Sequence, residues 1–188
     1  MSKLSYYKLY DDVEAPEFAT EGSACFDIYS YFGDESKYVH GKPLPIVVVY
    51  TMDNKKEERI VKMWASEPGN GFYMGVDLYP GERILIPTGL IFDIPEGHSV
   101  RIHPRSNISL KQGIMLGNSE GVIDSDYYHQ TFVMFYNASA DEIRIRNKER
   151  IAQGELIKTL DYSVEETIIQ PEQTTTRVGG FGSTGVIK

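Results

Sequence analysis

LGNSEGVIDSDY, residues 116–127, places glycines, an amide, acidic residues and an aromatic between short apolar runs typical of strands. Glycine lets the backbone approach a ligand closely, an asparagine amide both donates and accepts hydrogen bonds, and a carboxylate at a strand end can hold a water molecule. Together these residue types favour a nucleotide pocket. The same residues are common in ordinary β-turns, so this stretch alone leaves both interpretations open.

Short β-branched or aromatic runs, separated by glycine and proline, lie on both sides of this stretch. Such spacing predicts an all-β fold with little helix. Residues 143–146, Ile-Arg-Ile-Arg, alternate apolar and polar side chains, as a strand with one buried face does. The expected strands cover residues 45–50, 83–86, 89–94, 99–103, 130–136 and 142–146.

The composition is that of one globular domain, with 188 residues of which 41% are hydrophobic and 24% charged. Cys25 is the only cysteine, so an intrachain disulfide is excluded. The N-terminus has no signal-peptide core, and no apolar run approaches the ~18 residues of a membrane span. We therefore expect a cytoplasmic protein without a membrane partner. The net charge of −8 argues against general nucleic-acid binding, although a small polyphosphate ligand stays open.

Four further segments accompany the central one in order, and the five together resemble the motifs of the deoxyuridine triphosphatase (dUTPase) family. The resemblance implies a distorted jelly-roll-like β-barrel with one short helix at 107–112. It also implies hydrolysis of dUTP to dUMP and pyrophosphate by water attack at the α-phosphorus, which limits uracil incorporation into DNA and supplies dUMP for thymidylate synthesis. The segments are SACFDI (23–28), HPRSN (103–107), GVIDSDY (121–127), ERIAQ (149–153) and RVGGFGSTG (177–185).

The resemblance assigns catalysis to three residues. Asp124 matches the carboxylate that holds and activates the attacking water, while Ser106 and Gln153 match residues at the phosphates. From the sequence alone, an aspartate in this position is equally suited to a turn or cap, and Asp126 competes for the same role.

The resemblance also implies a set of substrate contacts. Asn118, Gly121 and Val122 match a hairpin that imitates a pairing base for uracil, and Tyr127 matches an aromatic beneath the deoxyribose. A core tyrosine is the ordinary alternative for Tyr127, and a surface salt bridge is the alternative for an arginine such as Arg105. The remaining substrate contacts implied by the resemblance are Arg105, Arg177, Phe181, Gly182, Ser183 and Thr184.

Magnesium is the cofactor that the resemblance implies. In the family the ion is carried by the triphosphate, and Asp27 matches an aspartate that contacts it through water. A hard, hydrated cation needs no cage of protein ligands. The scattered histidines agree with this, so we expect no tight His/Cys/carboxylate cluster and no zinc. These histidines are His40, His98, His103 and His129.

The domain prediction is a β-barrel over 1–170 and a flexible arm over 171–188, which in this family closes over the nucleotide of a homotrimer with shared active sites. Residues 33–76 separate the first two motifs by more than usual and are interpreted as an insertion. Within it, 45–50 and 59–64 would pair as a hairpin around a polar turn at 51–58, with a helix at 55–64 as the alternative. Trp64 and Tyr50 motivate the hypothesis that the insertion is a surface embellishment that binds a protein partner.

Two other functions compete with dUTP hydrolysis. A dCTP deaminase of the same fold would need a glutamate soon after the base-reading segment, and residues 127–136 contain none. A catalytically silent nucleotide-binding regulatory protein is the second alternative. Retention of Asp124, Ser106 and Gln153 argues against it. Cys25 and Asn107 stand where the family commonly has glycine.

Overall fold

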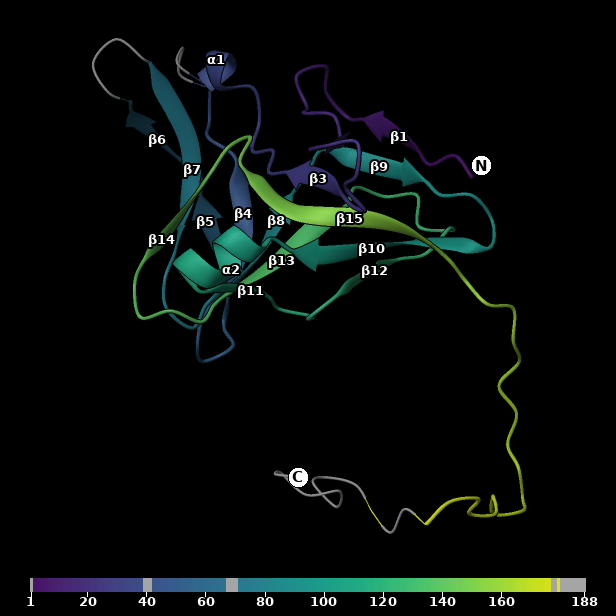
Figure 1. Cartoon of the computed structure of the whole chain (residues 1–188). Helices are drawn as coiled ribbons and strands as arrows, with labels where there is room; N and C mark the ends of the chain where they lie inside the picture. Colours follow the sequence, from purple (N-terminus) through teal and green to yellow (C-terminus); the bar gives the residue numbers. More distant parts are fainter. Residues whose placement is uncertain (1, 39–41, 67–70, 177–178, 180–188) are drawn as a thin grey trace.

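Antiparallel β-sheets dominate the computed structural model of the chain, which describes residues 2–38, 42–66, 71–176 and 179 (Figure 1). In this part of the chain two short helices accompany the strands. The helices are α1 (Glu35–Tyr38) and α2 (Ser106–Gln112). The strands are β1 (Ser5–Lys8), β2 (Glu17–Phe18), β3 (Phe26–Tyr29), β4 (Ile46–Tyr50), β5 (Lys56–Ile60), β6 (Lys62–Ala65), β7 (Phe72–Leu78), β8 (Arg83–Pro87), β9 (Leu90–Asp93), β10 (His98–Pro104), β11 (Ile114–Leu116), β12 (Gly121–Ile123), β13 (Phe132–Asn137), β14 (Ile143–Arg146) and β15 (Arg150–Lys158).

Two five-stranded sheets contain most of the motif segments. Their strand orders are β12-β10-β15-β3-β2 and β11-β13-β8-β4-β5, and smaller sheets are formed by β14-β7-β6 and β1-β9. Strands β8 and β14 bury every second residue, as expected for sheets with one face on a core. The shared core takes Ile102 from the first large sheet and Ile84 and Phe135 from the second. The all-β prediction is confirmed, and each expected strand is present within one or two residues.

Helix α2 agrees with the predicted helix, although it begins one residue earlier, at Ser106. Ile108 fixes it by entering the core with 4% of its surface exposed. The helix ends at Gly113, whose backbone is left-handed with φ of 69°. Only glycine suits this C-terminal position, since a Cβ there would lie 2.9 Å from Cβ of Ser139.

Residues 46–60, within the segment interpreted as an insertion, form a hairpin, so the helix alternative at 55–64 is wrong. Strand β4 pairs with β5 from Tyr50↔Lys56 to Ile46↔Ile60, around a turn in which the Thr51 N–H donates to the Lys55 carbonyl at 3.0 Å. The return strand is therefore 56–60 rather than 59–64. After Val61 the chain changes sheet, and β6 pairs with β7 instead. The buried side chain of Val61 marks this change of sheet, because it points into the core between two exposed neighbours.

The insertion is also part of the core, which corrects its description as a surface embellishment. Strand β4 joins β8 through Val49↔Ile84, and Val49 is fully buried. Trp64 packs within the chain, stacked on Tyr73 at 5.6 Å with the guanidinium of Arg144 3.8 Å from its ring centroid. Since Trp64 already has these partners, the structure gives no support to a protein partner at this site.

The chain leaves the barrel after β15, and residues 159–176 extend away from the sheets (Figure 1). Their side chains are exposed, so this extended segment begins before the boundary at 170 expected from the sequence. None of the helices in the described residues is of sufficient length and hydrophobicity to cross a membrane.

Candidate active site

Asp27 lies at the centre of a charged cluster formed by three neighbouring strands. Its carboxylate is buried and is approached by two guanidinium groups. Nε of Arg105 lies 3.1 Å from Oδ1, and Nη1 of Arg150 lies 3.3 Å from Oδ2. Arg105 also donates from Nη1 to the carbonyl of Arg150 at 3.4 Å. A buried carboxylate needs such compensation, because transfer from water is costly for an unpaired charge.

The strand register brings Gln153 into the same cluster. Gln153 on β15 stands opposite Asp27 on β3 and opposite His103 on β10. Residues paired in this way point to the same face of a sheet. Two expected phosphate contacts, Gln153 and Arg105, therefore share one face with Asp27, although the three residues are distant in the sequence.

Arg105 and Ser106 mark the junction between β10 and α2. Arg105 has an extended backbone and precedes the helix, while the Ser109 N–H donates to its carbonyl at 3.0 Å. This junction turns the chain so that the Arg105 guanidinium points back toward Asp27. Ser106, the next residue, is exposed at the start of α2. Ser106 thus directly follows Arg105 in the chain, and its contact with a phosphate stays a prediction.

The segment between β11 and β12 is a crossover between sheets, not the expected hairpin. Strand β11 pairs with β13, and β12 pairs with β10. The turn is closed by the Ser119 N–H, which donates to the Leu116 carbonyl at 3.0 Å. Gly121 packs against β10 so closely that a Cβ would lie 3.0 Å from Cβ of Ile102. A side chain here would have to displace Ile102, so strand packing favours glycine independently of any ligand.

A hollow of about 290 Å³ lies beside this crossover. Asn118, Gly121, Val122 and Tyr127 line it, so the structure brings together the residues expected to bind the nucleoside. The hydroxyl of Tyr127 donates to the Gln130 carbonyl at 3.0 Å, which fixes the ring, and 39% of its surface remains exposed. Tyr127 is therefore not a core tyrosine. Leu85, Ile102 and Phe132 supply apolar walls.

Asp124 follows β12 with an exposed side chain. Its carbonyl accepts from the Tyr127 N–H at 3.2 Å, which closes the turn after the strand. Within the described part of the chain, no hydrogen bond or ion pair occupies its carboxylate. A carboxylate in this state can accept a hydrogen bond from water. Asp126 is exposed as well, so exposure does not distinguish the two.

The two groups of candidate residues lie at opposite ends of β10. Ile123, just before Asp124, pairs with Val100 near the start of this strand, whereas Arg105 follows its last residue. Val100 and Arg105 are five residue steps apart along the strand, or about 17 Å. One chain alone therefore does not bring Asp124 to the Ser106 hydroxyl. The remaining candidates, Arg177, Phe181, Gly182, Ser183 and Thr184, lie outside the described residues.

The prediction that no His/Cys/carboxylate cluster exists is wrong. One ligand atom from each of Cys25, His103 and Glu155 lies within 4.8 Å of the other two. Nε2 of His103 is 3.4 Å from Oε2 of Glu155. Burial, reinforced by the charge of Glu155, raises the pKa of the Cys25 thiol, which is therefore protonated near neutral pH. The sequence did not reveal the cluster because its members come from three different strands or strand ends.

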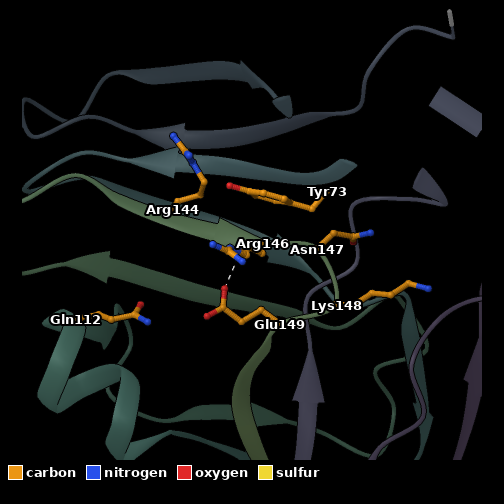
Figure 2. A pocket seen from close by; sticks show the side chains of 7 residues that line it. All are labelled: Tyr73, Gln112, Arg144, Arg146, Asn147, Lys148 and Glu149. Atoms are coloured by element: carbon orange, nitrogen blue, oxygen red, sulfur yellow. Dashed lines mark hydrogen bonds between the residues drawn. The ribbon is translucent and has the colours of Figure 1, made fainter. Parts of the chain in front are cut away.

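A larger hollow, of about 570 Å³, lies near the C-terminal end of α2 and contains none of the expected site residues (Figure 2). Figure 2 shows Arg144, Arg146 and Tyr73 on one side of it and Gln112 on the other. The guanidinium groups of these arginines serve the sheet itself, since Arg144 pairs with Asp77 at 2.8 Å and Arg146 lies over the Tyr73 ring at 4.5 Å. Volume alone therefore does not identify the site.

Arg150 is a functional candidate that the sequence analysis did not single out. It falls inside the ERIAQ segment, yet its guanidinium is the second positive charge on Asp27. About half of its side chain, 49%, is exposed, so it remains available to an anionic ligand. The sequence feature that could have identified Arg150 is its position at the start of β15, directly before the buried pair Ile151 and Ala152.

Comparison with known proteins gives consistent results. The dUTPase family model matches residues 74–185, which include four of the five motif segments but not Asp27. The deoxyuridine 5'-triphosphate nucleotidohydrolase of Caulobacter vibrioides is 31% identical over 175 residues, covering 93% of this chain and 88% of that protein. The corresponding protein of Brucella melitensis is 44% identical over 108 residues, covering 57% of this chain and 68% of that protein.

Solved structures share the fold at lower identity. A mutant dUTPase of Staphylococcus bacteriophage 80alpha, solved with dUpNHpp, aligns with a TM-score of 0.66 and 20% identity over 99% of this chain and 100% of that one. The Streptococcus mutans dUTPase aligns with a TM-score of 0.57 and 19% identity over 85% of this chain and 98% of that one. These similarities agree with the distorted jelly-roll-like barrel expected from the sequence.

Proposed function

The chain belongs to the dUTPase family, and from this membership we propose that it hydrolyses dUTP to dUMP and pyrophosphate. The reaction is attack of water at the α-phosphorus. Its cellular consequences would be less uracil in DNA and a supply of dUMP for thymidylate synthesis. The observation that supports the proposal is the clustering of Arg105 and Gln153 with Asp27, because it brings a guanidinium group and an amide to one face of the sheet.

Asp124 is the proposed general base. Water attack on phosphorus is aided by a carboxylate that orients the water and accepts its proton. The exposed carboxylate of Asp124, which has no hydrogen bond or ion pair with another described residue, suits this role. Arg105 would offset the charge that develops on the leaving pyrophosphate, while Ser106 and Gln153 donate hydrogen bonds to phosphate oxygens. Arg150 adds a second positive charge, and Asp27 fixes the orientation of both arginines.

The hollow beside β12 is the proposed nucleoside pocket. Asn118 and the backbone from Gly121 to Val122 would hydrogen-bond the uracil edge. Cytosine presents the opposite donor and acceptor pattern, so it would leave buried polar groups unpaired. Tyr127 would pack beneath the deoxyribose and exclude a 2′-hydroxyl.

Magnesium is proposed to arrive with the triphosphate. When bound it would neutralise charge on the phosphate oxygens. Asp27 is the one protein contact proposed for the ion, and its carboxylate already faces Arg105 and Arg150 at 3.1 and 3.3 Å. This arrangement suits contact through water with an ion held by the substrate, and it does not suit direct coordination in a cage of protein ligands.

A homotrimer with shared sites is the proposed assembly. The spacing of roughly 17 Å along β10 supports sharing, because Asp124 and Ser106 of one chain are too far apart to act on one phosphate group. Asp124 of one copy would complete the Arg105 and Ser106 site of another. The C-terminal arm, residues 171–188, would close over the nucleotide of a neighbouring copy through Arg177, Phe181, Gly182, Ser183 and Thr184. A cytoplasmic location remains a prediction.

Pyrophosphate release tests the proposed reaction. The intact chain is assayed with Mg²⁺ and dUTP, dCTP, dTTP or UTP, together with a truncation after Thr176. We expect release from dUTP alone and its loss in the truncated chain. Release of ammonia from dCTP would instead indicate a deaminase, and binding of dUTP without any release would indicate a regulatory protein.

A further inference from the structure

The cluster of Cys25, His103 and Glu155 lies on the same face of the β12-β10-β15-β3-β2 sheet as the Asp27 site. Cys25 is two residues before Asp27, Glu155 is two residues after Gln153, and His103 stands opposite Gln153. Side chains two residues apart on a strand point to one face. The three side chains therefore converge because of strand register, while the proposed hydrolysis uses none of them.

The geometry of the cluster matches a small tetrahedral ion. Zinc bonds of about 2.0–2.3 Å place neighbouring ligand atoms roughly 3.3–3.8 Å apart. Nε2 of His103 and Oε2 of Glu155 already lie 3.4 Å apart, and the Cys25 sulfur lies within 4.8 Å of a ring nitrogen of His103 and of a carboxylate oxygen of Glu155.

The hydrogen bonding of the His103 imidazole also bears on the site. Its Nε2 atom is buried and makes no hydrogen bond in the described residues, despite the nearby Glu155 carboxylate. On the other side of the ring, Nδ1 lies 3.7 Å from Oε1 of Glu120. Histidine ligands of metals commonly present one nitrogen to the ion and the other to a carboxylate, which sets the tautomer. Glu120 is placed to do this.

The chemistry of the donors selects the metal. Thiolate, imidazole and carboxylate together suit zinc, whereas magnesium requires oxygen ligands. We propose that Cys25, His103 and Glu155 bind one zinc ion per chain, with the fourth position open to water and Glu120 orienting His103. The ion replaces the proton of the Cys25 thiol on binding. This site is separate from the magnesium that is proposed to arrive on the substrate.

An ion-pair network is the competing explanation of the same residues. A protonated His103 could bridge Glu120 and Glu155, and Arg101 already pairs with Glu120 at 3.2 Å. That network has no use for the Cys25 thiol. A measurement that detects a metal–sulfur bond therefore separates the two explanations without reference to nucleotide hydrolysis.

Cobalt substitution provides that measurement. The chelator-treated full-length protein is titrated with Co²⁺ in the absence of nucleotide. We expect a thiolate-to-cobalt charge-transfer band in the near ultraviolet and intense visible bands of a tetrahedral ion, saturating at one equivalent per chain and abolished by stoichiometric Zn²⁺. Absence of the thiolate band in the wild-type protein overturns the proposal, and so does saturation at one equivalent per three chains.

Three variants and a control assign the ligands. Cys25→Ser and His103→Gln should each lower the zinc affinity more than about a hundredfold, and Glu120→Gln, which leaves the three proposed ligands in place, should lower it about tenfold to a hundredfold. His98→Gln is the matched control, because His98 lies on the same strand but hydrogen-bonds Ser2 and the Glu96 backbone. Circular dichroism establishes that each variant is folded. Unchanged zinc affinity in folded Cys25→Ser contradicts the site.

Discussion

Nε of Arg105 lies 3.1 Å from Oδ1 of Asp27, although Arg105 follows β10 and Asp27 belongs to β3. The contact crosses β15, which separates these two strands in the sheet. It thereby joins the first and second motif segments across the insertion. The position of the proposed phosphate-binding arginine depends on a buried carboxylate that need not touch the substrate directly.

Replacement of Asp27 by asparagine tests this dependence. Arg105 and Arg150 would lose the charge that orients them, and a misplaced phosphate contact reduces kcat/KM by up to about a hundredfold. We expect most of the loss in KM for dUTP, measured by pyrophosphate release. Asp161→Asn is the control, since Asp161 is exposed in the segment after β15. Equal kinetics in Asp27→Asn and Asp161→Asn would remove Asp27 from the site.

Asp124 and Asp126 are distinguished by turnover. Asp124→Asn should lower kcat by about 10² to 10⁴, the usual contribution of a general base, while the affinity for dUTP is retained. Asp126→Asn should keep kcat near that of the wild type. Equilibrium binding of dUTP and single-turnover rates measure the two quantities separately. Loss of turnover in Asp126→Asn alone would reverse the assignment.

The ion pairs of Asp77 should make the free energy of unfolding depend on pH. Burial works to raise the pKa of this carboxyl, but hydrogen bonds from Arg144 and Lys62 at 2.8 and 3.0 Å outweigh it, so the pKa is lowered. A lowered folded-state pKa stabilises the fold above the unfolded-state value, about 3.9, and this stabilisation disappears as the pH falls through the folded-state pKa. Asp77→Asn should therefore cost about 2 kcal/mol at pH 7, and this cost should shrink as the pH falls below about 3.9.

Urea denaturation at pH 3 and pH 7 measures that difference. Asp53→Asn is the control, because Asp53 pairs with Lys55 on the exposed turn of the β4–β5 hairpin. A stability difference for Asp77→Asn that is the same at pH 3 and pH 7 would show that its carboxylate charge contributes nothing.

The insertion should be necessary for stability. Val49 is fully buried where β4 meets β8, so Val49→Ala removes buried methyl groups and leaves a cavity. We expect a loss of about 2–3 kcal/mol in the free energy of unfolding. Ile46→Ala on the same strand should change it by less than about 0.5 kcal/mol, because 56% of Ile46 is exposed. Similar values for the two variants would restore the view that the hairpin is a surface addition.

The sequence predicted strands well because their signal is local. Alternation in 143–146 and the β-branched run in 45–50 each reflect one buried face, and both became strands. The end of the hairpin was placed wrongly, since Val61 and Trp64 continue the apolar pattern across a change of sheet. Residues 62–65 join a different sheet because they pair with β7. Such long-range pairing cannot be predicted from the local sequence pattern.

The sequence identified site residues only within the motif segments. Arg105, Ser106 and Gln153 were identified by the family resemblance, and their proximity to Asp27 follows from strand order. The contacts of Arg150 and His103 could not be foreseen, because they depend on register between strands far apart in the sequence. The shared sites implied by the family resemblance gain a structural reason from the pairing of β12 with the first half of β10, which separates Asp124 from Ser106.

Complementation between two inactive chains tests the central claim most directly. Asp124→Asn and Ser106→Ala chains are prepared separately, unfolded together at equal concentration, refolded and assayed for pyrophosphate release from dUTP. If each site takes Asp124 from one copy and Ser106 from another, random mixing restores about one quarter of the wild-type sites. Each variant refolded alone supplies the baseline. The proposed hydrolase with shared sites predicts this recovery; activity of the mixture no higher than the baseline would contradict it.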